Sequence, residues 1–481
     1  MKKTIQNTIY TAFLILLTLA GCKKALEVDL PVEVSTAEAV YGSTITASSV
    51  MKGVYKRLQG YGPLNDATGT TILTSLLGDE FKANGGSQYQ NLPIPLGGRW
   101  NDWYRKVIYQ VNSVMEGVAA SKKLNPGAKD ILTGEAKFIR AFSYFNLVNI
   151  FGDVPLVLNT DFNANANIAR SPTAKVYEQM VADLLDAQRL LPEKYLKPDL
   201  ITESTERVVA SKFTATALLA RVYLYMGQWD KAIAESDKII GRADLFKLVD
   251  LDKVFLMNSP EAIMQFQTGD GPVGEDAMNT AEGRVLIPRQ NDNGKYNVPN
   301  YWISDFLLNE FEAGDKRKDN WINLIPTNNT AKPIYPIAWK YKVGQNLGPQ
   351  SEYYMVLRLA EQYLIRAEAR AHMGNIGGAF EDLKVIRQRA GLGDSPYADV
   401  FEAIAHERYV ELFAELGHRW FDLKRTGKLD DRMKIVMPTK QIGNGPVPTW
   451  EPFKAVMGIP YTEFKLNPAL IGHQNPGYRE N

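Results

Sequence analysis

Apolar residues recur at intervals of three and four positions along most of this chain, which is the spacing of amphipathic helices. In residues 103–119, for example, Val107, Val111, Val114 and Val118 fall on one helical face. The same spacing predicts further helices in residues 43–59, 132–151, 172–191, 211–226, 229–240, 353–389 and 397–417. The chain is therefore predicted to be mainly α-helical.

Two helical pairs have the spacing of tetratricopeptide repeats, in which antiparallel helices pack through small and aromatic positions. In residues 211–240, Ala220 and Ala232 allow close approach, and Tyr223 and Trp229 fill the space beside them. The second match comprises Ala367, Gly374, Ala379, Leu383 and Ile386. Because the two pairs are far apart in sequence, we expect scattered helical pairs in one right-handed scaffold rather than a tandem solenoid.

Residues 245–350 lose this periodicity and are rich in Gly, Pro, Asn and Asp. Long loops of this kind in a compact protein usually carry function. The segment also holds several aromatic residues, namely Tyr296, Tyr301, Trp302, Trp321, Tyr335, Trp339 and Tyr341. We therefore expect an N-terminal helical region at 22–244, an irregular, loop-rich variable lobe at 245–350 and a C-terminal region at 351–481.

The first 21 residues read as a bacterial export signal, with Lys2 and Lys3 ahead of a short apolar run at 12–17. The signal ends in Leu-Ala-Gly before Cys22, which resembles the lipobox of bacterial lipoproteins. Cys22 is the only cysteine, which excludes a disulfide framework and a cysteine-based metal site. We expect cleavage before Cys22 and anchoring through its acyl chains, because several chains together hold a protein stably on a membrane.

Charge and composition exclude several classes of function. Lys plus Arg number 55 and Asp plus Glu number 54, so no field of one sign attracts nucleic acid. Hydrophobic residues make up 45%, which suffices for a large core. The four histidines show no metal-ligand spacing, and phosphate-binding and nucleophile-elbow motifs are absent from the sequence. No metal, cofactor or nucleic acid is therefore expected.

Residues 161–172 begin like a calcium loop, with oxygen-bearing side chains at Asp161, Asn163, Asn165 and Asn167. The sixth position, however, is Ala166 and the twelfth is Pro172, where such loops carry Gly and Glu. We expect a solvated loop.

A charged set near residues 407–425 has the spacing of ion pairs rather than of an acid–base site. Arg408 lies three positions before Glu411, and Glu415 lies four before Arg419. Paired carboxylates lack the raised pKa of a general acid, so we expect a structural ion network here. Arg358, Glu361 and Glu368 are interpreted in the same way.

A glycosidase would instead need two carboxylates in a cleft. The acidic pair outside the helices that could supply them is Asp79 with Glu80.

Several ordered motifs resemble the SusD/RagB family. Residues 358–369 are similar to that family's RyAEvLLiyAEA helix, and residues 387–392 to its iRxRaGl element. Residues 406–425 contain the motif ER followed by GHRWFDLKR, and the tail has a Gly-Ile-Pro at 458–460 and Asn-Pro at 467–468. Further similarity at 103–112 and 135–156 extends the resemblance over nearly the whole mature chain, with 245–350 matching weakly.

The resemblance implies an outer-membrane lipoprotein that faces the cell exterior and acts as a hinged lid on a SusC-like TonB-dependent barrel transporter. It implies capture of a glycan, or in some members a peptide, without catalysis. It also implies a fold of tetratricopeptide-like helices with an irregular lobe. The alternative is a tetratricopeptide-type scaffold lipoprotein that binds only protein partners.

Sugars present an apolar C–H face that flat aromatic rings hold, with a few polar groups for the hydroxyls. Trp103 and Tyr104, which share a helix with Asn112, are assigned to the core. The predicted ligand-binding residues are Tyr89, Trp100, Asn101, Tyr296, Trp302, Trp321 and Trp339.

Overall fold

The computed structural model describes residues 37–59, 62–64, 69–87, 89–92, 97–267, 279–345 and 349–480. The chain divides into two compact units, Met1–Val40 and Tyr41–Asn481. In the first unit the described element is the short helix α2 (Ala37–Val40). The predicted signal peptide and Cys22 lie outside the described residues, and the domain boundaries expected near 245 and 350 stay predictions.

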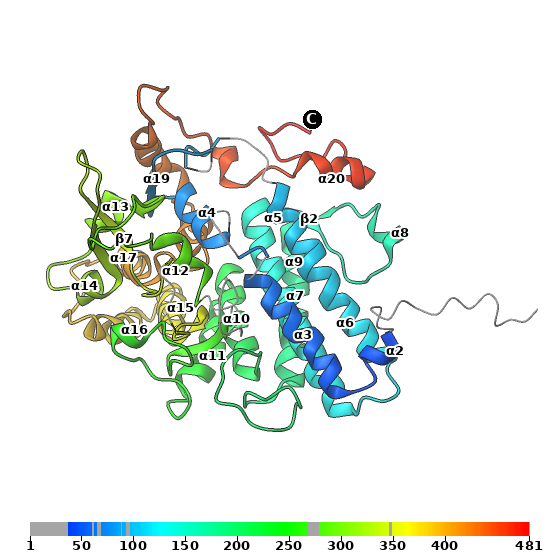
Figure 1. Cartoon of the computed structure of the whole chain (residues 1–481). Coiled ribbons are helices and arrows are strands. Elements are labelled where there is room, and N and C mark those ends of the chain that lie inside the picture. Colours follow the sequence, from blue (N-terminus) through cyan, green and yellow to red (C-terminus); the bar gives the residue numbers. More distant parts are fainter. Residues whose placement is uncertain are drawn as a thin grey trace, which may run out of the picture. The chain divides into compact units, whose positions relative to one another are not determined.

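Long helices packed side by side form one half of the second unit (Figure 1). Helix α3 (Thr44–Gln59) packs on α6 (Tyr109–Ala120) and on α7 (Pro126–Phe151), and α7 packs on α9 (Thr173–Leu190). A π-helical segment, η2 (Asp102–Ile108), runs directly into α6.

Helix α7 begins earlier than the predicted 132, because local signals start it there. The Asn125 side chain accepts a hydrogen bond from the N–H of Ala128, and Pro126 occupies the first helical turn, where it removes no needed donor.

The helical layer continues through segments that are distant in sequence. Helix α9 packs on α10 (Lys212–Tyr225), α10 on α11 (Trp229–Ile240), α11 on α15 (Leu359–His372) and α15 on α16 (Ile376–Arg389). The two tetratricopeptide-like pairs, α10–α11 and α15–α16, are therefore direct neighbours. Sequence separation alone had suggested scattered pairs.

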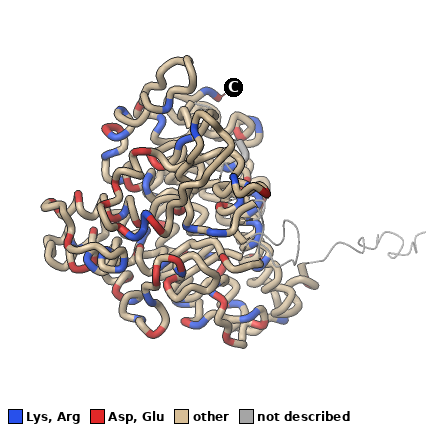
Figure 2. The backbone as a smooth tube through the Cα atoms, turned by 60° about the vertical axis from the view of Figure 1, so that its left-hand side comes forward, with Lys and Arg blue, Asp and Glu red and all other residues tan. Residues whose placement is uncertain are grey.

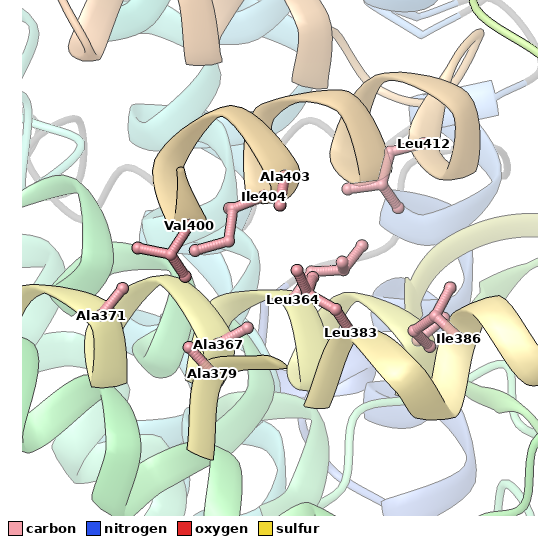
Figure 3. Packing of buried hydrophobic residues seen from close by; sticks show 11 residues of the cluster. Leu364, Ala367, Ala371, Ala379, Leu383, Ile386, Val400, Ala403, Ile404 and Leu412 are labelled. Atoms are coloured by element: carbon pink, nitrogen blue, oxygen red, sulfur yellow. The ribbon is translucent and has the colours of Figure 1, made fainter. Parts of the chain in front are cut away.

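The second pair is closed by α17 (Val400–Leu412), which packs on both α15 and α16. Figure 3 shows apolar side chains of the three helices facing one another, among them Leu364, Leu383 and Ile404. The small residues Ala367 and Ala379 are fully buried at this contact, as the repeat-like spacing predicts.

The prediction of one helix over 353–389 is wrong at its start. Tyr354–Arg358 form strand β8, which pairs antiparallel with β4 (Ala262–Phe266). All five residues of each strand are buried, so neither strand shows the polar–apolar alternation that marks a half-exposed strand.

The helix predicted over 397–417 also ends early, at Leu412. Ala414, Leu416 and Gly417 have φ angles of 53°, 42° and 79°, which a right-handed helix does not permit.

Three more two-stranded antiparallel sheets lie in the described residues. They pair β1 (Phe81–Ala83) with β5 (Tyr301–Ile303), β2 (Val154–Pro155) with β3 (Arg170–Ser171), and β6 (Ile322–Pro326) with β7 (Ile334–Ala338). The other short α-helices are α4 (Thr70–Leu77), α5 (Gly97–Asn101), α8 (Phe162–Asn165), α12 (Ala281–Leu286), α13 (Asp305–Leu308), α14 (Lys316–Trp321), α18 (His418–Arg425), α19 (Leu429–Val436) and α20 (Tyr461–Leu466). Short 3₁₀ helices are η3 (Leu251–Lys253), η5 (Met437–Lys440), η6 (Pro452–Ala455) and η7 (Pro468–Leu470). Among the helices described, none has the length and apolar character needed to cross a membrane.

Candidate functional site

Three of the predicted ligand-binding residues meet in one aromatic cluster of the irregular lobe. Its buried members are Ile287, Trp302, Ile325, Tyr335 and Ile337, and the half-buried Tyr296 and Trp339 pack against them. We call these seven residues the lobe cluster. The pairing of β6 with β7 and of β1 with β5 brings them together from segments up to 52 residues apart in sequence, as Ile287 and Trp339 are.

A lysine lies against the faces of two rings of the lobe cluster. The Trp302 and Tyr335 rings meet edge to face with centroids 5.2 Å apart. The Nζ of Lys332 lies 4.5 Å from the Trp302 centroid and 4.6 Å from the Tyr335 centroid, within the range of a cation–π contact. Partial burial, together with the charge of Lys82, lowers the pKa of Lys332. These two rings are therefore partly covered by Lys332. Tyr296 and Trp339 are half-buried, and the Nζ of Lys342 lies 5.8 Å from the Trp339 centroid.

Polar groups surround the lobe cluster. Asn329 donates a hydrogen bond of 2.9 Å from Nδ2 to the hydroxyl of Tyr335. Lys82 of β1 forms an ion pair with Asp305 of α13. These groups carry the donors and acceptors that sugar hydroxyls require. Sequence reasoning missed them because Lys, Asp and Asn are common surface residues and no local pattern marks them.

Tyr89 belongs to the same neighbourhood but is buried, with 5% of its surface exposed. Burial raises its pKa to about 12, with a further contribution from the charge of Asp305. The Nζ of Lys440 lies 5.3 Å from its ring centroid. Asp305 thus acts electrostatically on both Tyr89 and Lys332.

Trp321 lies apart from the lobe cluster, in the core. Its ring is fully buried, and its Nε1 donates to the carbonyl of Leu251 at 2.9 Å. The rings of Phe255 and Phe413 pack against it, and the Nζ of Lys340 lies 4.6 Å from its centroid.

Trp100 and Asn101 lie at a third place, on α5. The Trp100 ring is 2% exposed and packs on Tyr104 and Phe151, at centroid distances of 5.2 and 5.1 Å. Asn101 is half-buried and hydrogen-bonded to the side chain of Glu463. The structure therefore distributes the seven predicted residues over separate places, and their contact with a ligand stays a prediction.

The residues assigned to the core from sequence lie there. Trp103 and Asn112 are fully buried. Asn112 donates to the carbonyl of Val157 and accepts from Arg140, while the hydroxyl of Tyr104 donates to the carbonyl of Pro155.

A charged network fills the centre of the C-terminal region. Arg317 contacts Glu407 at 2.5 Å and Glu411 at 3.1 Å, and Arg358 contacts Glu411 at 2.6 Å and Glu415 at 2.8 Å. We call the set the buried ion network; its members are Glu261, Asp315, Arg317, Lys340, Arg358, Arg389, Glu407, Glu411 and Glu415. Burial opposes ionisation of Glu411, but its three arginine partners outweigh it and hold its pKa well below the ordinary value.

The expected structural role of these charges agrees with this geometry, but the predicted partners are wrong. Arg408 pairs with Asp422 at 2.7 Å rather than with Glu411, and Arg419 pairs with Asp79 rather than with Glu415. Glu415 and Arg419 do not share a helical face because α17 ends at Leu412 and α18 begins at His418. Arg408 and Glu411 both lie within α17, but Glu411 is bound by Arg317, Arg358 and Arg389 from other segments.

Asp79 and Glu80 do not form a cleft pair. Asp79 is 1% exposed and is bound by Arg419 and Arg432 at 2.8 and 2.6 Å. Burial alone would raise its pKa, yet these two arginines lower it to about 2. Burial raises the pKa of Glu80 to about 7, and its carboxylate accepts a hydrogen bond from Ser75.

The remaining polar motifs serve local structure. The Asp161 side chain accepts the N–H of Ala164 and caps α8. No cluster of three His, Cys, Asp or Glu suited to a metal ion occurs in the described part of the chain. In the view of Figure 2, Lys and Arg positions are interspersed with Asp and Glu positions along the backbone.

Comparison with known proteins now assigns the family. A profile described as "Starch-binding associating with outer membrane" matches residues 75–224, and the SusD family profile matches residues 327–478. Together the two matches span more than half of the chain.

Similar sequences and structures agree. SusD-like protein P25 of Formosa agariphila is 25% identical over 99% of this chain and all of its own length. A SusD-like protein of Bacteroides ovatus is 24% identical over 68% of this chain and 65% of its own. A laminarin-binding SusD-like protein superposes with a TM-score of 0.69 at 23% identity, covering 90% of this chain and 99% of its own. Surface glycan-binding protein A from Bacteroides uniformis superposes with a TM-score of 0.70 at 20% identity, covering 89% and 98%.

The tetratricopeptide-like scaffold, the two profile matches and the SusD-like relatives lead to one assignment: the chain belongs to the SusD/RagB family of outer-membrane glycan-binding proteins, which bind their ligands without catalysing a reaction.

Proposed function

We propose that this protein captures an oligosaccharide at the cell surface and delivers it to a SusC-like TonB-dependent transporter. The observation that carries the proposal is the lobe cluster, in which the half-buried rings of Tyr296 and Trp339 lie beside buried aromatic residues and a lysine. Two similar structures are named for binding laminarin and surface glycans, which supports a glycan over a peptide.

The lobe cluster suits a sugar for physical reasons. Tyr296 and Trp339 offer apolar ring surface to C–H groups, and the rigid packing of Trp302 on Tyr335 holds them in place at little entropic cost. Lys332 and Asn329 supply donors at the rim. In this proposal Trp302 supports the two rings from within the lobe cluster, and the buried Tyr89 and Trp321 contribute stability.

Binding of a glycan panel tests the proposal. Soluble protein beginning after Cys22 is screened against oligosaccharides and peptides, followed by titration of any hit with Tyr296→Ala and Trp339→Ala. We expect each variant to bind the glycan at least tenfold more weakly, which corresponds to a loss of ~1.4 kcal/mol in binding free energy. Tyr461→Ala removes a ring that is 53% exposed on α20 and serves as the matched control.

Each other outcome has a defined meaning. Normal glycan binding by both ring variants contradicts the assignment of the lobe cluster. A hit among peptides alone contradicts the glycan ligand, and absence of binding to either panel favours the protein-binding scaffold.

Anchoring through Cys22 is a separate part of the proposal. The lipobox-like sequence before Cys22 supports it. Cys22→Ser is expected to release the protein from the membrane fraction into the soluble one, because the acyl chains supply the membrane affinity. Retention of the variant on the membrane contradicts lipid anchoring at this residue.

A further inference from the structure

The lysine that lies on the lobe cluster is a cation without a polar partner. The half-buried Lys332 places its Nζ against the ring faces of Trp302 and Tyr335, at 4.5 and 4.6 Å from their centroids. The part of the chain that the structure describes offers this Nζ neither an ion pair nor a hydrogen-bond acceptor. The donors of the Lys332 ammonium are therefore open to a ligand.

The turn between β6 and β7 holds Lys332 at the edge of the lobe cluster. The N–H of Thr327 donates to the carbonyl of Pro333 at 2.7 Å, and the Thr327 hydroxyl donates to the carbonyl of Lys332 at 3.4 Å. The Oδ1 of Asn329 accepts from the N–H of Lys332 at 3.3 Å. Thr327 also forms a β-bridge with Tyr296. Lys332 and Tyr296 therefore flank the same residue, on a backbone that needs little ordering when a ligand binds.

The surroundings of Lys332 compensate its charge only weakly. Partial burial and the charge of Lys82 lower the pKa of Lys332, and the charge of Asp305 opposes this effect. Asp305 is itself ion-paired with Lys82, so the carboxylate that acts on Lys332 is already neutralised by another lysine. An anionic group of a ligand therefore meets a positive charge without a counter-charge.

The lysine beside Trp339 is engaged instead by the protein. The Nζ of Lys342 lies 5.8 Å from the Trp339 centroid and donates to the carbonyls of Trp339 and Asn320. The backbone N–H of Lys342 donates to the carboxylate of Glu352, whose charge partly offsets the effect of burial on the ammonium. Lys342 therefore serves local structure, and Lys332 is the cation that a ligand can use.

Two further donors beside Lys332 lack an acceptor. The Nε1 of Trp302 is buried and has no hydrogen-bond partner among the described residues. The hydroxyl of Tyr335 accepts from the Nδ2 of Asn329 at 2.9 Å, and its own proton has no acceptor in the described part of the chain. A buried donor without a partner is costly, so an incoming acceptor is favoured. Three unpaired donors match a ligand group that only accepts, whereas a sugar hydroxyl also donates.

We propose that the lobe cluster selects an acidic oligosaccharide, with a uronate carboxylate or a sulfate ester, and that Lys332 is the residue that selects it. The inference rests on the proposed function, because it places the sugar on the rings of Tyr296 and Trp339. The anionic oxygens of the ligand accept hydrogen bonds from the Nζ of Lys332 while a C–H face packs on these rings. Carboxylates and sulfates share this chemistry, since both present charged oxygens that only accept.

Paired glycans test the preference by calorimetric titration of the soluble protein that begins after Cys22, at one fixed ionic strength. Polygalacturonate and alginate carry carboxylates, and sulfated laminarin and dextran sulfate carry sulfates. Their neutral counterparts are the esterified uronates, laminarin and dextran. We expect at least one acidic glycan to bind about tenfold or more tightly than its counterpart, because a charge-assisted hydrogen bond is stronger than a neutral one. Binding of the uronates alone or of the sulfated glycans alone identifies the anionic group.

Failure of this inference is distinguishable from failure of the proposed function. Equal binding of an acidic glycan and its neutral counterpart, or binding of neutral glycans alone, overturns the acidic preference. Glycan capture by the lobe cluster still stands in that case if Tyr296→Ala and Trp339→Ala weaken the binding. Absence of binding to every glycan overturns both proposals.

Variants of Lys332 assign the preference to one side chain. Lys332→Met keeps an unbranched apolar side chain without the charge, and is expected to reduce the ratio of acidic to neutral affinity from about tenfold to about one. Lys332→Arg keeps the charge and is expected to retain the ratio. Lys465→Met is the matched control, because the Nζ of Lys465 lies 5.6 Å from the centroid of Tyr461 on α20, outside the lobe cluster. An unchanged ratio in Lys332→Met, or an equal loss in Lys465→Met, overturns the proposal.

Discussion

Replacing Arg358 with Met perturbs the buried ion network at a cation that contacts three carboxylates. The Arg358 guanidinium makes five hydrogen bonds with described residues, to Glu261, to Glu411 and to Glu415. Its side chain is 2% exposed, so water cannot replace it. Methionine is unbranched and uncharged, so it removes the interactions while it still fills the space of the aliphatic part of the arginine.

The magnitude follows from the charges left behind. The nine residues named above comprise four cations and five carboxylates, and Arg387 also contacts Glu407 at 3.2 Å. The variant removes one cation and leaves every carboxylate in place. Removing one member of a buried ion pair costs about 3–5 kcal/mol, because the partner charge stays buried and uncompensated. We expect the free energy of unfolding to fall by about 4 kcal/mol, since Arg389 and Lys340 still contact the three carboxylates.

The loss should depend on pH with a defined sign. Glu411 and Glu415 have pKa values below their ordinary range, because their cationic partners outweigh burial. A carboxyl with a lowered pKa stabilises the fold above its unfolded pKa and loses that contribution as the pH falls. Without Arg358 these pKa values rise, so the difference between the two proteins is largest above about pH 5 and narrows in acid.

Urea unfolding followed by tryptophan fluorescence measures the effect, because Trp321 lies beside the network. Lys175→Met is the control: Lys175 pairs with Glu178 on the surface of α9, with 65% of its side chain exposed, and should cost less than about 1 kcal/mol. A loss below about 1 kcal/mol for Arg358→Met, or a loss independent of pH, would refute this reasoning.

Two further predictions concern single sites. Asp79→Asn should destabilise the protein by about 3 kcal/mol near neutral pH, because it removes a buried carboxylate and leaves two partly buried arginines without it. Since Asp79 has a pKa of about 2, the difference should vanish between about pH 4 and pH 2, and a constant difference in urea midpoint would contradict the assigned ion pairs. Gly417→Ala should cost about 1–2 kcal/mol, because φ is 79° and an added Cβ would lie 2.9 Å from a ring carbon of Phe421. Gly377→Ala on α16, where a Cβ meets open space, should instead stabilise by about 0.5 kcal/mol, and equal effects in thermal unfolding would refute the distinction.

Local periodicity determined most helices of this protein. The predicted 43–59, 172–191, 211–226 and 229–240 correspond within one or two residues to α3, α9, α10 and α11. This works because the apolar face of a helix repeats within the segment itself, and caps such as Ser211 mark its start. Local periodicity gave the wrong element at 354–358, where a helix was predicted and a strand is found. A fully buried strand and a buried helical turn have the same apolar composition, so the pattern cannot separate them.

For the ion pairs, too, the sequence predicted one part and the tertiary structure decided the other. The sequence identified which charges belong to a network, because so many acids and arginines lie close together along it. Their partners come from α14, from Glu261 just before β4 and from the chain beyond α17, so only the packing of distant elements determined them.

The sequence did not predict which aromatic residues are exposed to solvent. Trp321 and Trp339 are both tryptophans in the same Asn- and Pro-rich region, yet one is fully buried and the other only partly buried. Whether a ring reaches solvent depends on neighbours such as Phe413, which is more than 70 residues away in sequence. The sequence by itself determined the family, the helices and the residue types suited to a sugar. The tertiary structure decided which rings gather and which charges pair. Both depend on contacts between segments that are distant in sequence, and no local sequence pattern specifies such contacts.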